Sequence, residues 1–238
     1  MALPRVNETL NFTMTVPSSG DRVKYRPYLV KEEKILLQAF ESGDVQTCLE
    51  AMIETLDACI DPGHSLDIAS LATFDVEYMF TQVRSKSVGE KSGILIKCRS
   101  CEEPNGYSLD LDELKVDIET TANVIKINDD ISVEMKYPTY KTLIDGNEKG
   151  AGEGSTDAAM LMLAASIGAV LTEEERIDCS TQSGEEMVEF LSSMTAAQLK
   201  LVSNFLDDMP ALKHLAEFDC EKCGEHNEVE LKGLSDFF

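Results

Sequence analysis

The sequence is short of basic residues and contains no tryptophan. Its 238 residues include 21 lysines and arginines against 44 aspartates and glutamates, which gives a formal net charge of −23 and an isoelectric point near 4.4. Proteins that bind nucleic acid or an anionic membrane gain much of their affinity from positive side chains that contact phosphates. The composition therefore argues against both functions. It indicates either a need for solubility or a protein partner with a basic surface.

The sequence also lacks a long apolar run and a secretory signal. Residues 1–20 contain no basic segment followed by an apolar block, so we expect the protein to be made and kept in a cytoplasm. The longest nearly apolar run, residues 158–171, has 14 residues, whereas a helix that crosses a bilayer needs about 20. We interpret this run as a buried helix and expect no membrane insertion.

Motifs of the common catalytic sites are missing as well. The sequence contains no phosphate-binding loop of the GxxxxGK[ST] or GxGxxG kind. It has only three histidines, and neither His64 nor His214 is accompanied by a serine or cysteine in a recognisable nucleophile motif. We therefore predict that the protein is not an enzyme.

The N-terminal part of the chain predicts a β-hairpin followed by helices. Residues 11–16 alternate apolar and polar side chains, a Pro-Ser-Ser-Gly turn follows, and a second strand resumes at Arg22. Apolar residues spaced by three and four then predict helices, one beginning after Asp44 and another capped by Asp75.

The remainder of the chain predicts strands first and helices afterwards. Strand-like patterns occur over residues 94–96, 107–111, 124–127 and 131–135, and the last two are expected to pair as a hairpin. Four glycines between residues 146 and 154 indicate a mobile connector. Helical patterns follow over residues 156–171, 183–194 and 196–206, with a capping box at Ser183.

These patterns predict an α+β fold with six segments. The segments are an N-terminal hairpin (1–28), a helical unit (29–92), a β-rich segment (93–140), a glycine-rich linker (141–155), a helical segment (156–210) and a C-terminal strand segment (211–238). The central antiparallel strands and the C-terminus are expected to form a zinc ribbon that is split in the sequence.

A pair of CxxC units is the feature of the sequence that indicates metal binding. Cys98 and Cys101 form one unit, and Cys220 and Cys223 form the other, which Gly224 follows. Each unit lies between strand-like stretches, as a zinc knuckle at the tip of a β-hairpin requires. Two knuckles supply four thiolates, so we predict one structural Zn²⁺ per chain with no open coordination position for catalysis.

The wide separation of the two units has to be weighed against this prediction. There are 118 residues between them, whereas ordinary ribbons have about 15–20 residues between knuckles. Closing such a loop costs about 4–5 kcal/mol, and structural Zn²⁺ contributes about 10–16 kcal/mol of apparent binding energy. The alternatives are a redox pair and inert thiols, and a disulfide is disfavoured in a cytoplasm. His226 is a possible replacement for one sulfur, although an exposed polar turn residue is its simpler role.

Three stretches of the sequence resemble one known family. They are residues 23–34 (VKYRPYLVKEEK), residues 74–90 (FDVEYMF and RSKSVGE), and Cys220–Gly224 followed by LKGLSDFF at residues 231–238. Together they resemble the baseplate proteins of T-even-type bacteriophages with contractile tails, in the branch that acts in hub assembly. The resemblance runs over nearly the whole chain.

The resemblance implies a non-enzymatic late protein of viral tail morphogenesis whose partners are other baseplate hub or tail proteins. Such a protein acts in the host cytoplasm as an assembly chaperone, or stays in the virion as a permanent subunit of the baseplate hub. A zinc-ribbon adaptor of transcription or translation is a further alternative that the negative charge disfavours. For partner binding we single out Arg26, Pro27, Tyr28, Phe237 and Phe238. Burial of these side chains in the protein's own core is the competing interpretation.

Overall fold

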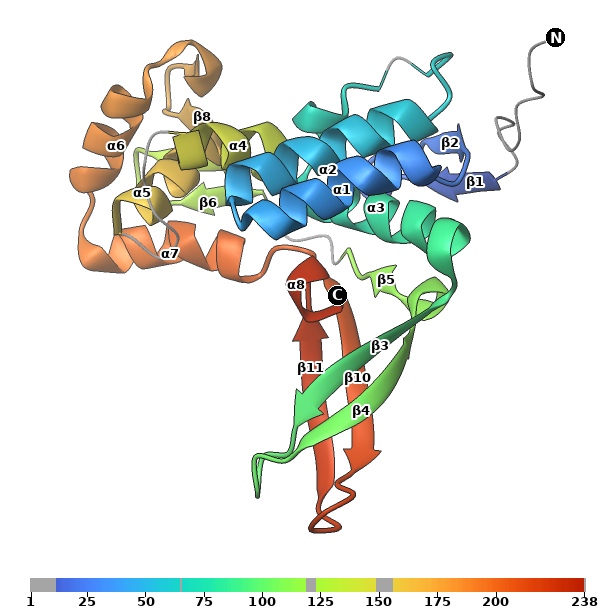
Figure 1. The fold of residues 1–238 in the computed structure, drawn as a ribbon. Helices are drawn as coiled ribbons and strands as arrows, with labels where there is room; N and C mark the ends of the chain where they lie inside the picture. The colour runs from blue at the N-terminus through green and yellow to red at the C-terminus, as the bar shows by residue number, and fades with distance from the viewer. Residues whose placement is uncertain (1–11, 65, 119–122, 149–155, 238) are drawn as a thin grey trace, which may run out of the picture. The chain divides into compact units, whose positions relative to one another are not determined.

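The computed structural model describes residues 12–64, 66–118, 123–148 and 156–237, and it shows an α+β protein with antiparallel sheets (Figure 1). The chain forms two compact units, each assembled from segments that are distant in sequence. The first unit consists of Met1–Ile68, Phe74–Ile118 and Pro210–Phe238, and the second consists of Ala69–Thr73 and Glu119–Met209. No helix of the described residues is long and apolar enough to cross a membrane.

The first unit begins with the predicted hairpin. Strand β1 (Phe12–Thr15) pairs antiparallel with β2 (Arg22–Tyr25), with Phe12 opposite Tyr25. Gly20 closes the turn with a φ of 74°, and its N–H donates to the Val16 carbonyl at 2.9 Å. Alternate side chains of the hairpin are buried, as the alternating sequence requires.

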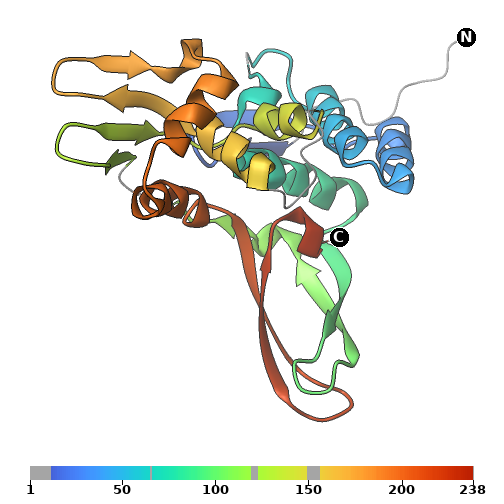
Figure 2. The same cartoon turned by 90° about the vertical axis from the view of Figure 1, so that its left-hand side faces the viewer.

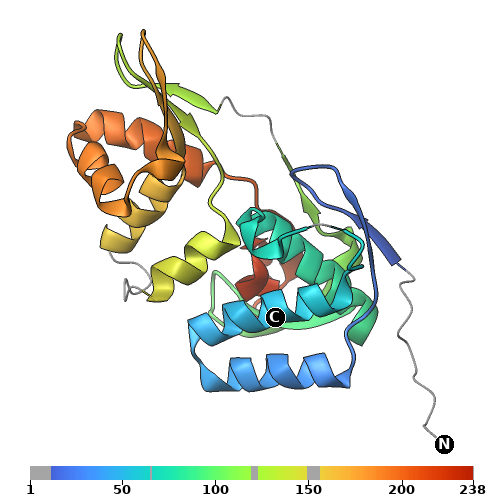
Figure 3. The ribbon, with the colours of Figure 1, turned by 90° about the horizontal axis from the view of Figure 1, so that it is seen from above.

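Two antiparallel helices follow, and Figure 3 shows them side by side. Helix α1 (Val30–Ser42) ends at Gly43, whose φ of 66° gives a left-handed C-cap. Helix α2 (Val45–Cys59) begins where the sequence predicted, after Asp44, and the Asp44 carboxylate caps it by accepting from the Thr47 N–H at 2.9 Å. Helix α2 buries Met52, Leu56 and Cys59, which have the spacing of three and four residues that predicted this helix.

Asp75 is not the N-cap of the third helix. Helix α3 (Thr73–Val88) begins two residues earlier and places Asp75 in its first turn, where the side chain is fully buried. The carboxylate accepts hydrogen bonds from the backbone N–H (2.9 Å) and the hydroxyl (2.5 Å) of Ser18. Asp75 thus joins the turn of the N-terminal hairpin to α3. Sequence reasoning missed this contact because the acceptor and its donors are 57 residues apart.

Two further hairpins complete the first unit, and Figure 2 shows them lying together. One consists of β3 (Lys91–Lys97) and β4 (Pro104–Asp110), and the other of β10 (Leu212–Asp219) and β11 (His226–Lys232). The short strand β5 (Lys115–Val116) pairs with β10, and helix α8 (Leu234–Phe237) follows β11. The core of this region contains Ile96, Leu109, Leu111, Leu114, Leu212, Ala216, Leu231 and Phe237.

Glu77 of α3 yields a prediction on pH dependence. A Cβ placed on Gly233 would lie 3.7 Å from Oε2 of Glu77, so the carboxyl lies close to the end of β11. Burial raises the pKa of Glu77 from 4.5 to about 7, and the nearby Lys232 ammonium lowers it in part. The folded protein therefore binds this proton more tightly than the unfolded chain, and stability is lost as the pH rises from 4.5 towards 7.

We expect Glu77→Gln to remove this loss. The variant should match the wild type at acidic pH and exceed its free energy of unfolding by about 1–3 kcal/mol above neutrality. Urea unfolding at a series of pH values measures the difference. Glu54→Gln, at an exposed position of α2, is the matched control and should run parallel to the wild type. A Glu77→Gln curve that also runs parallel would contradict the prediction.

The second unit contains a four-stranded antiparallel sheet and a group of helices. The sheet has the order β6 (Val124–Lys126), β7 (Ser132–Met135), β8 (Ile167–Leu171) and β9 (Arg176–Asp178), so the predicted pairing of β6 with β7 is confirmed. The helices are α4 (Tyr140–Glu148), α5 (Thr156–Ala165), α6 (Gly184–Ser192) and α7 (Ala196–Asp207). Three short 3₁₀ turns, Ile68–Ser70, Leu111–Glu113 and Cys179–Thr181, complete the elements of the described residues.

The interpretation of residues 158–171 as one helix is wrong. Helix α5 ends at Ala165, and Ile167–Leu171 forms strand β8, which pairs with β7. Gly168 lies close to the partner strand, since a Cβ there would be 3.4 Å from the Glu134 carbonyl oxygen. An apolar run suits a buried helix and a buried strand equally, and here the neighbouring strands decide. The half expected to be helical therefore contains a β-hairpin.

The first part of the predicted linker, which was expected over residues 141–155, is helical. Residues 140–148 form helix α4, and the rest of the glycine-rich stretch, residues 149–155, lies outside the described residues. At α6 the predicted capping box is present. The Ser183 hydroxyl accepts from the Glu186 N–H at 3.2 Å, and the Glu186 carboxylate accepts from the Ser183 N–H at 2.8 Å.

Candidate metal centre

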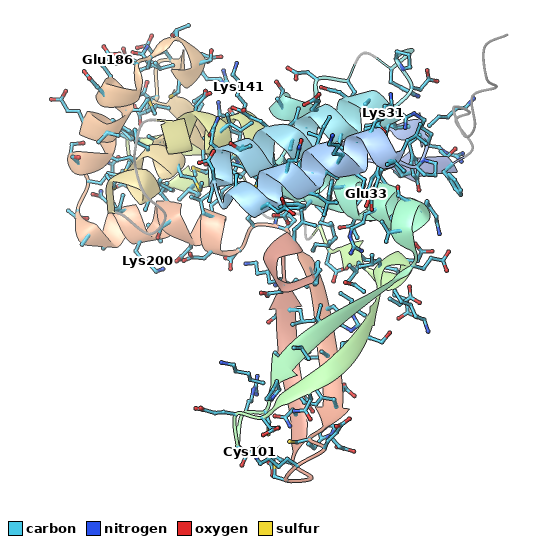
Figure 4. The ribbon with its side chains drawn as sticks, in the orientation of Figure 1. Lys31, Glu33, Cys101, Lys141, Glu186 and Lys200 are labelled. Atoms are coloured by element: carbon cyan, nitrogen blue, oxygen red, sulfur yellow. The ribbon has the colours of Figure 1, made fainter. Side chains whose placement is uncertain are left out.

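The four cysteines of the two CxxC units lie together at the tips of the paired hairpins. Cys98 and Cys101 belong to the turn between β3 and β4, and Cys220 and Cys223 belong to the turn between β10 and β11. All four sulfur atoms lie within 4.8 Å of one another. Figure 4 labels Cys101 at this end of the hairpins. Segments with 118 residues between them in the sequence thus supply one cluster.

Two of the distances between sulfurs are those expected at a tetrahedral metal site. Sγ of Cys98 lies 3.7 Å from Sγ of Cys223, and Sγ of Cys101 lies 3.6 Å from Sγ of Cys220. Four thiolates at 2.3 Å from a central Zn²⁺ form a tetrahedron with edges of about 3.8 Å. These contacts are much longer than the ~2.05 Å of a disulfide. The described cluster is therefore compatible with a structural metal ion held by four thiolates.

The backbone of each turn explains how two sulfurs of one unit face the same point. The Cys98 N–H donates to the Glu103 carbonyl, and the Glu102 N–H donates to the Cys98 carbonyl, both at 2.9 Å. In the second turn Cys220 pairs in the same way with Glu225, and the Gly224 N–H donates to the Cys220 carbonyl, again at 2.9 Å.

The residue after each second cysteine has a left-handed backbone. Gly224 has a φ of 72°, as the glycine in the sequence predicts, and Glu102 adopts a φ of 57° at the equivalent position. A non-glycine residue pays a steric cost in this region. The first turn therefore adopts the same conformation as the second in spite of its sequence.

Hydrogen bonds favour ionisation of the first cysteine of each turn. The backbone N–H of Cys101 lowers the pKa of Cys98, and the backbone N–H groups of Cys223 and Lys222 lower the pKa of Cys220 to about 6. For Cys223 the Glu225 N–H lowers the pKa, but the neighbouring thiols raise it to about 12 overall. Since thiolates so close together repel one another, ionising all four requires a cation between them.

Two buried asparagines that sequence reasoning missed contact these sulfurs. The amide nitrogen of Asn227 lies 3.5 Å from Sγ of Cys98, and that of Asn105 lies 3.7 Å from Sγ of Cys220. The signal was available in the sequence as a repeat, because CRSCEEPN at residues 98–105 and CEKCGEHN at residues 220–227 share the pattern CxxCxExN.

His226 does not belong to the cluster. Its Nδ1 lies 2.8 Å from Oδ1 of Asp219, and the ring is exposed at the start of β11. Its hydrogen bond to the Asp219 carboxylate raises the pKa of the imidazole. His226 is therefore an exposed polar residue next to the turn.

The predicted partner-binding residues near the N-terminus differ in how far they are exposed. Arg26 is buried, and its guanidinium donates to the Glu32 carboxylate (2.8 Å) and to the Ala58 carbonyl (2.7 Å). Pro27 and Tyr28 are partly exposed. The prediction for Arg26 is corrected, because the side chain is used to join α1 to the end of α2.

For the two C-terminal phenylalanines, the structure tests the prediction of partner binding at Phe237 only. Phe237 has no exposed surface and packs in the core beneath the paired hairpins, so it is not available to a partner. This is the competing interpretation that the sequence left open. Phe238 lies outside the described residues.

The fold and the cysteine cluster define an α+β protein in which a four-thiol site joins two distant hairpins. The family described as "T4 bacteriophage base plate protein" matches residues 9–238 of the chain. The chain belongs to this family, which confirms the resemblance seen in the sequence. No curated protein matches the chain, and no solved structure does. A role in the phage tail baseplate, with other baseplate proteins as partners, follows from family membership.

Proposed function

We propose that the protein acts in assembly of the baseplate hub, without enzymatic activity, and that one structural Zn²⁺ completes its fold. The observation that supports the proposal is the cysteine cluster within a chain of the baseplate family. In this proposal the paired hairpins form a zinc ribbon divided in the sequence. A site with four thiolate ligands has no open position for a substrate, so the ion acts as a structural crosslink.

The location of the protein during infection tests the assembly role. Mass spectrometry of purified particles, compared with infected-cell lysate, should find the protein enriched in the lysate, and a pull-down from the lysate should recover hub proteins. Stoichiometric presence in purified particles would overturn the assembly role. It would instead establish a permanent subunit of the hub, which is the second candidate that family membership supports.

We further propose that the partner surface includes helix α1 next to Tyr28. Val30 and Leu37 are 79% and 55% exposed, and their spacing of seven residues places them on one face of the helix. Lys31 and Glu33, labelled in Figure 4, lie on the same helix. Exposed apolar side chains at helical spacing are typical of a face that docks on another protein.

Leu37→Glu is the variant that tests this surface. It should reduce recovery of baseplate proteins in the pull-down about tenfold or more, because a charge in a docked apolar face costs upwards of about 1.4 kcal/mol. Its melting temperature should stay that of the wild type. Leu201→Glu, at a 47% exposed leucine of α7, is the matched control and should bind normally. Equal recovery with both variants would reject the α1 surface.

A further inference from the structure

The two asparagines of the CxxCxExN repeat form hydrogen bonds from each hairpin to the other. Asn105 lies at the start of β4, and its Oδ1 accepts from the backbone N–H of Glu221 at 2.9 Å. Asn227 lies at the start of β11, and its Oδ1 accepts from the backbone N–H of Arg99 at 2.9 Å. In both cases the donor follows the first cysteine of the opposite turn. The two contacts are therefore reciprocal.

The amide nitrogens complete the same arrangement. Nδ2 of Asn105 donates to the Glu103 carbonyl of its own turn at 2.8 Å and also contacts Sγ of Cys220. Nδ2 of Asn227 donates to the Glu225 carbonyl of its own turn at 2.8 Å and also contacts Sγ of Cys98. Each amide thus uses its acceptor and both donors, and it holds its own turn and the opposite one at once.

Burial makes these hydrogen bonds important. Asn105 is 4% exposed and Asn227 is 1% exposed, so a substitution that removes one of these hydrogen bonds would leave a buried side-chain polar atom without its partner. The pattern also depends on the amide. An aspartate of the same size keeps the acceptor but loses the donor to the sulfur and places a second negative charge beside it.

We propose that Asn105 and Asn227 are reciprocal positioning residues, which fix the two hairpin tips to each other and hold Cys98 and Cys220 ready for the metal. The two turns are equivalent halves of one repeated unit, related by the CxxCxExN pattern. The part of this inference that concerns the metal rests on the proposed zinc site. The bracing of the tips does not depend on the zinc site, because every hydrogen bond involved joins protein groups only.

Zinc affinity tests the metal-positioning part. Asn105→Asp and Asn227→Asp should each weaken Zn²⁺ binding about 10–100-fold, as is typical when a group that orients a ligand is changed, and by similar amounts because the contacts are reciprocal. Competition with a chromogenic chelator measures the affinity. Asn128→Asp adds the same charge at an exposed turn of the second unit and should bind Zn²⁺ as the wild type does. Unchanged affinity in both tip variants would overturn the positioning role.

Hydrogen exchange in metal-free wild-type protein tests the bracing by itself. The N–H groups of Arg99 and Glu221 should exchange slowly with chelator present, and they should exchange at least tenfold faster in Asn227→Asp and Asn105→Asp respectively. Fast exchange of both amides in the wild type would overturn the brace, and this result needs no variant to fold. Slow exchange in a protein that binds no Zn²⁺ would support the brace and reject the zinc site. Failure of the brace and failure of the zinc site therefore give different results.

Discussion

Cys98→Ser and Cys220→Ser should each abolish zinc binding and lower the stability of the first unit by the same amount. Each removes one ligand of the same proposed ion, so the loss should not depend on which hairpin carries the change. With free zinc at about a thousand times its dissociation constant, the ion contributes about 4 kcal/mol. Elemental analysis should find one zinc per wild-type chain and none in either variant, and urea unfolding should give the matching loss of stability.

The double variant makes this test sharper. When the first cysteine has been lost, the second no longer has an ion to bind, so Cys98→Ser with Cys220→Ser should cost little more than either single change. Cys48→Ser is the matched control, because Cys48 is a partly exposed cysteine of α2 outside the cluster. Unequal and additive losses from the two single changes would show that the cysteines do not share a site.

Phe237→Ala should destabilise the first unit by about 3–5 kcal/mol, the range for a large buried aromatic residue. The side chain of Phe237 is fully buried with Leu212 and Leu231, and its carbonyl accepts from the Ser92 hydroxyl of β3 at 2.8 Å. Helix α8 thus ties the end of β11 to the other hairpin. Thermal or urea unfolding of the purified variant measures the loss.

The control for Phe237→Ala is a residue of the same hairpin pair that has little packing to lose. Leu95 of β3 is 77% exposed, so Leu95→Ala should change the free energy of unfolding by less than about 0.5 kcal/mol. Deleting the last three residues should likewise lower stability. A truncated protein that is as stable as the wild type but fails in hub assembly would contradict the burial of Phe237 and restore its docking role.

Features encoded by neighbouring residues were predictable from the sequence. The first hairpin, the caps at Asp44 and Ser183 and the β6–β7 hairpin all depend on side chains a few residues apart, and each is present. The CxxC spacing and the following Gly224 belong to the same group, since the turn is local. The asparagines were also visible as a repeat, but the pattern becomes informative only when the two turns face each other.

Apart from the cysteine cluster, features that depend on distant partners were not predicted from the sequence. Arg26 has the charge and position of a surface residue, yet Glu32 and the end of α2 enclose it. Asp75 suits an N-cap, but Ser18 supplies its hydrogen bonds. The run at residues 158–171 divides at Ser166 because β7 and β9 offer backbone partners to β8. In each case the deciding group lies in another part of the chain.

The sequence by itself determined the acidic charge, the α+β class, the local turns and the family of baseplate proteins. Each of these depends on composition or on residues that are close together in the chain. The CxxC spacing also predicted that the two cysteine turns share one site, and the structure brings their sulfurs together. The tertiary structure alone decided that Asn105 and Asn227 join the turns and that Phe237 is in the core. The physical reason is that burial and hydrogen bonding between distant segments depend on which surfaces pack together, and spacing along the chain does not record that choice.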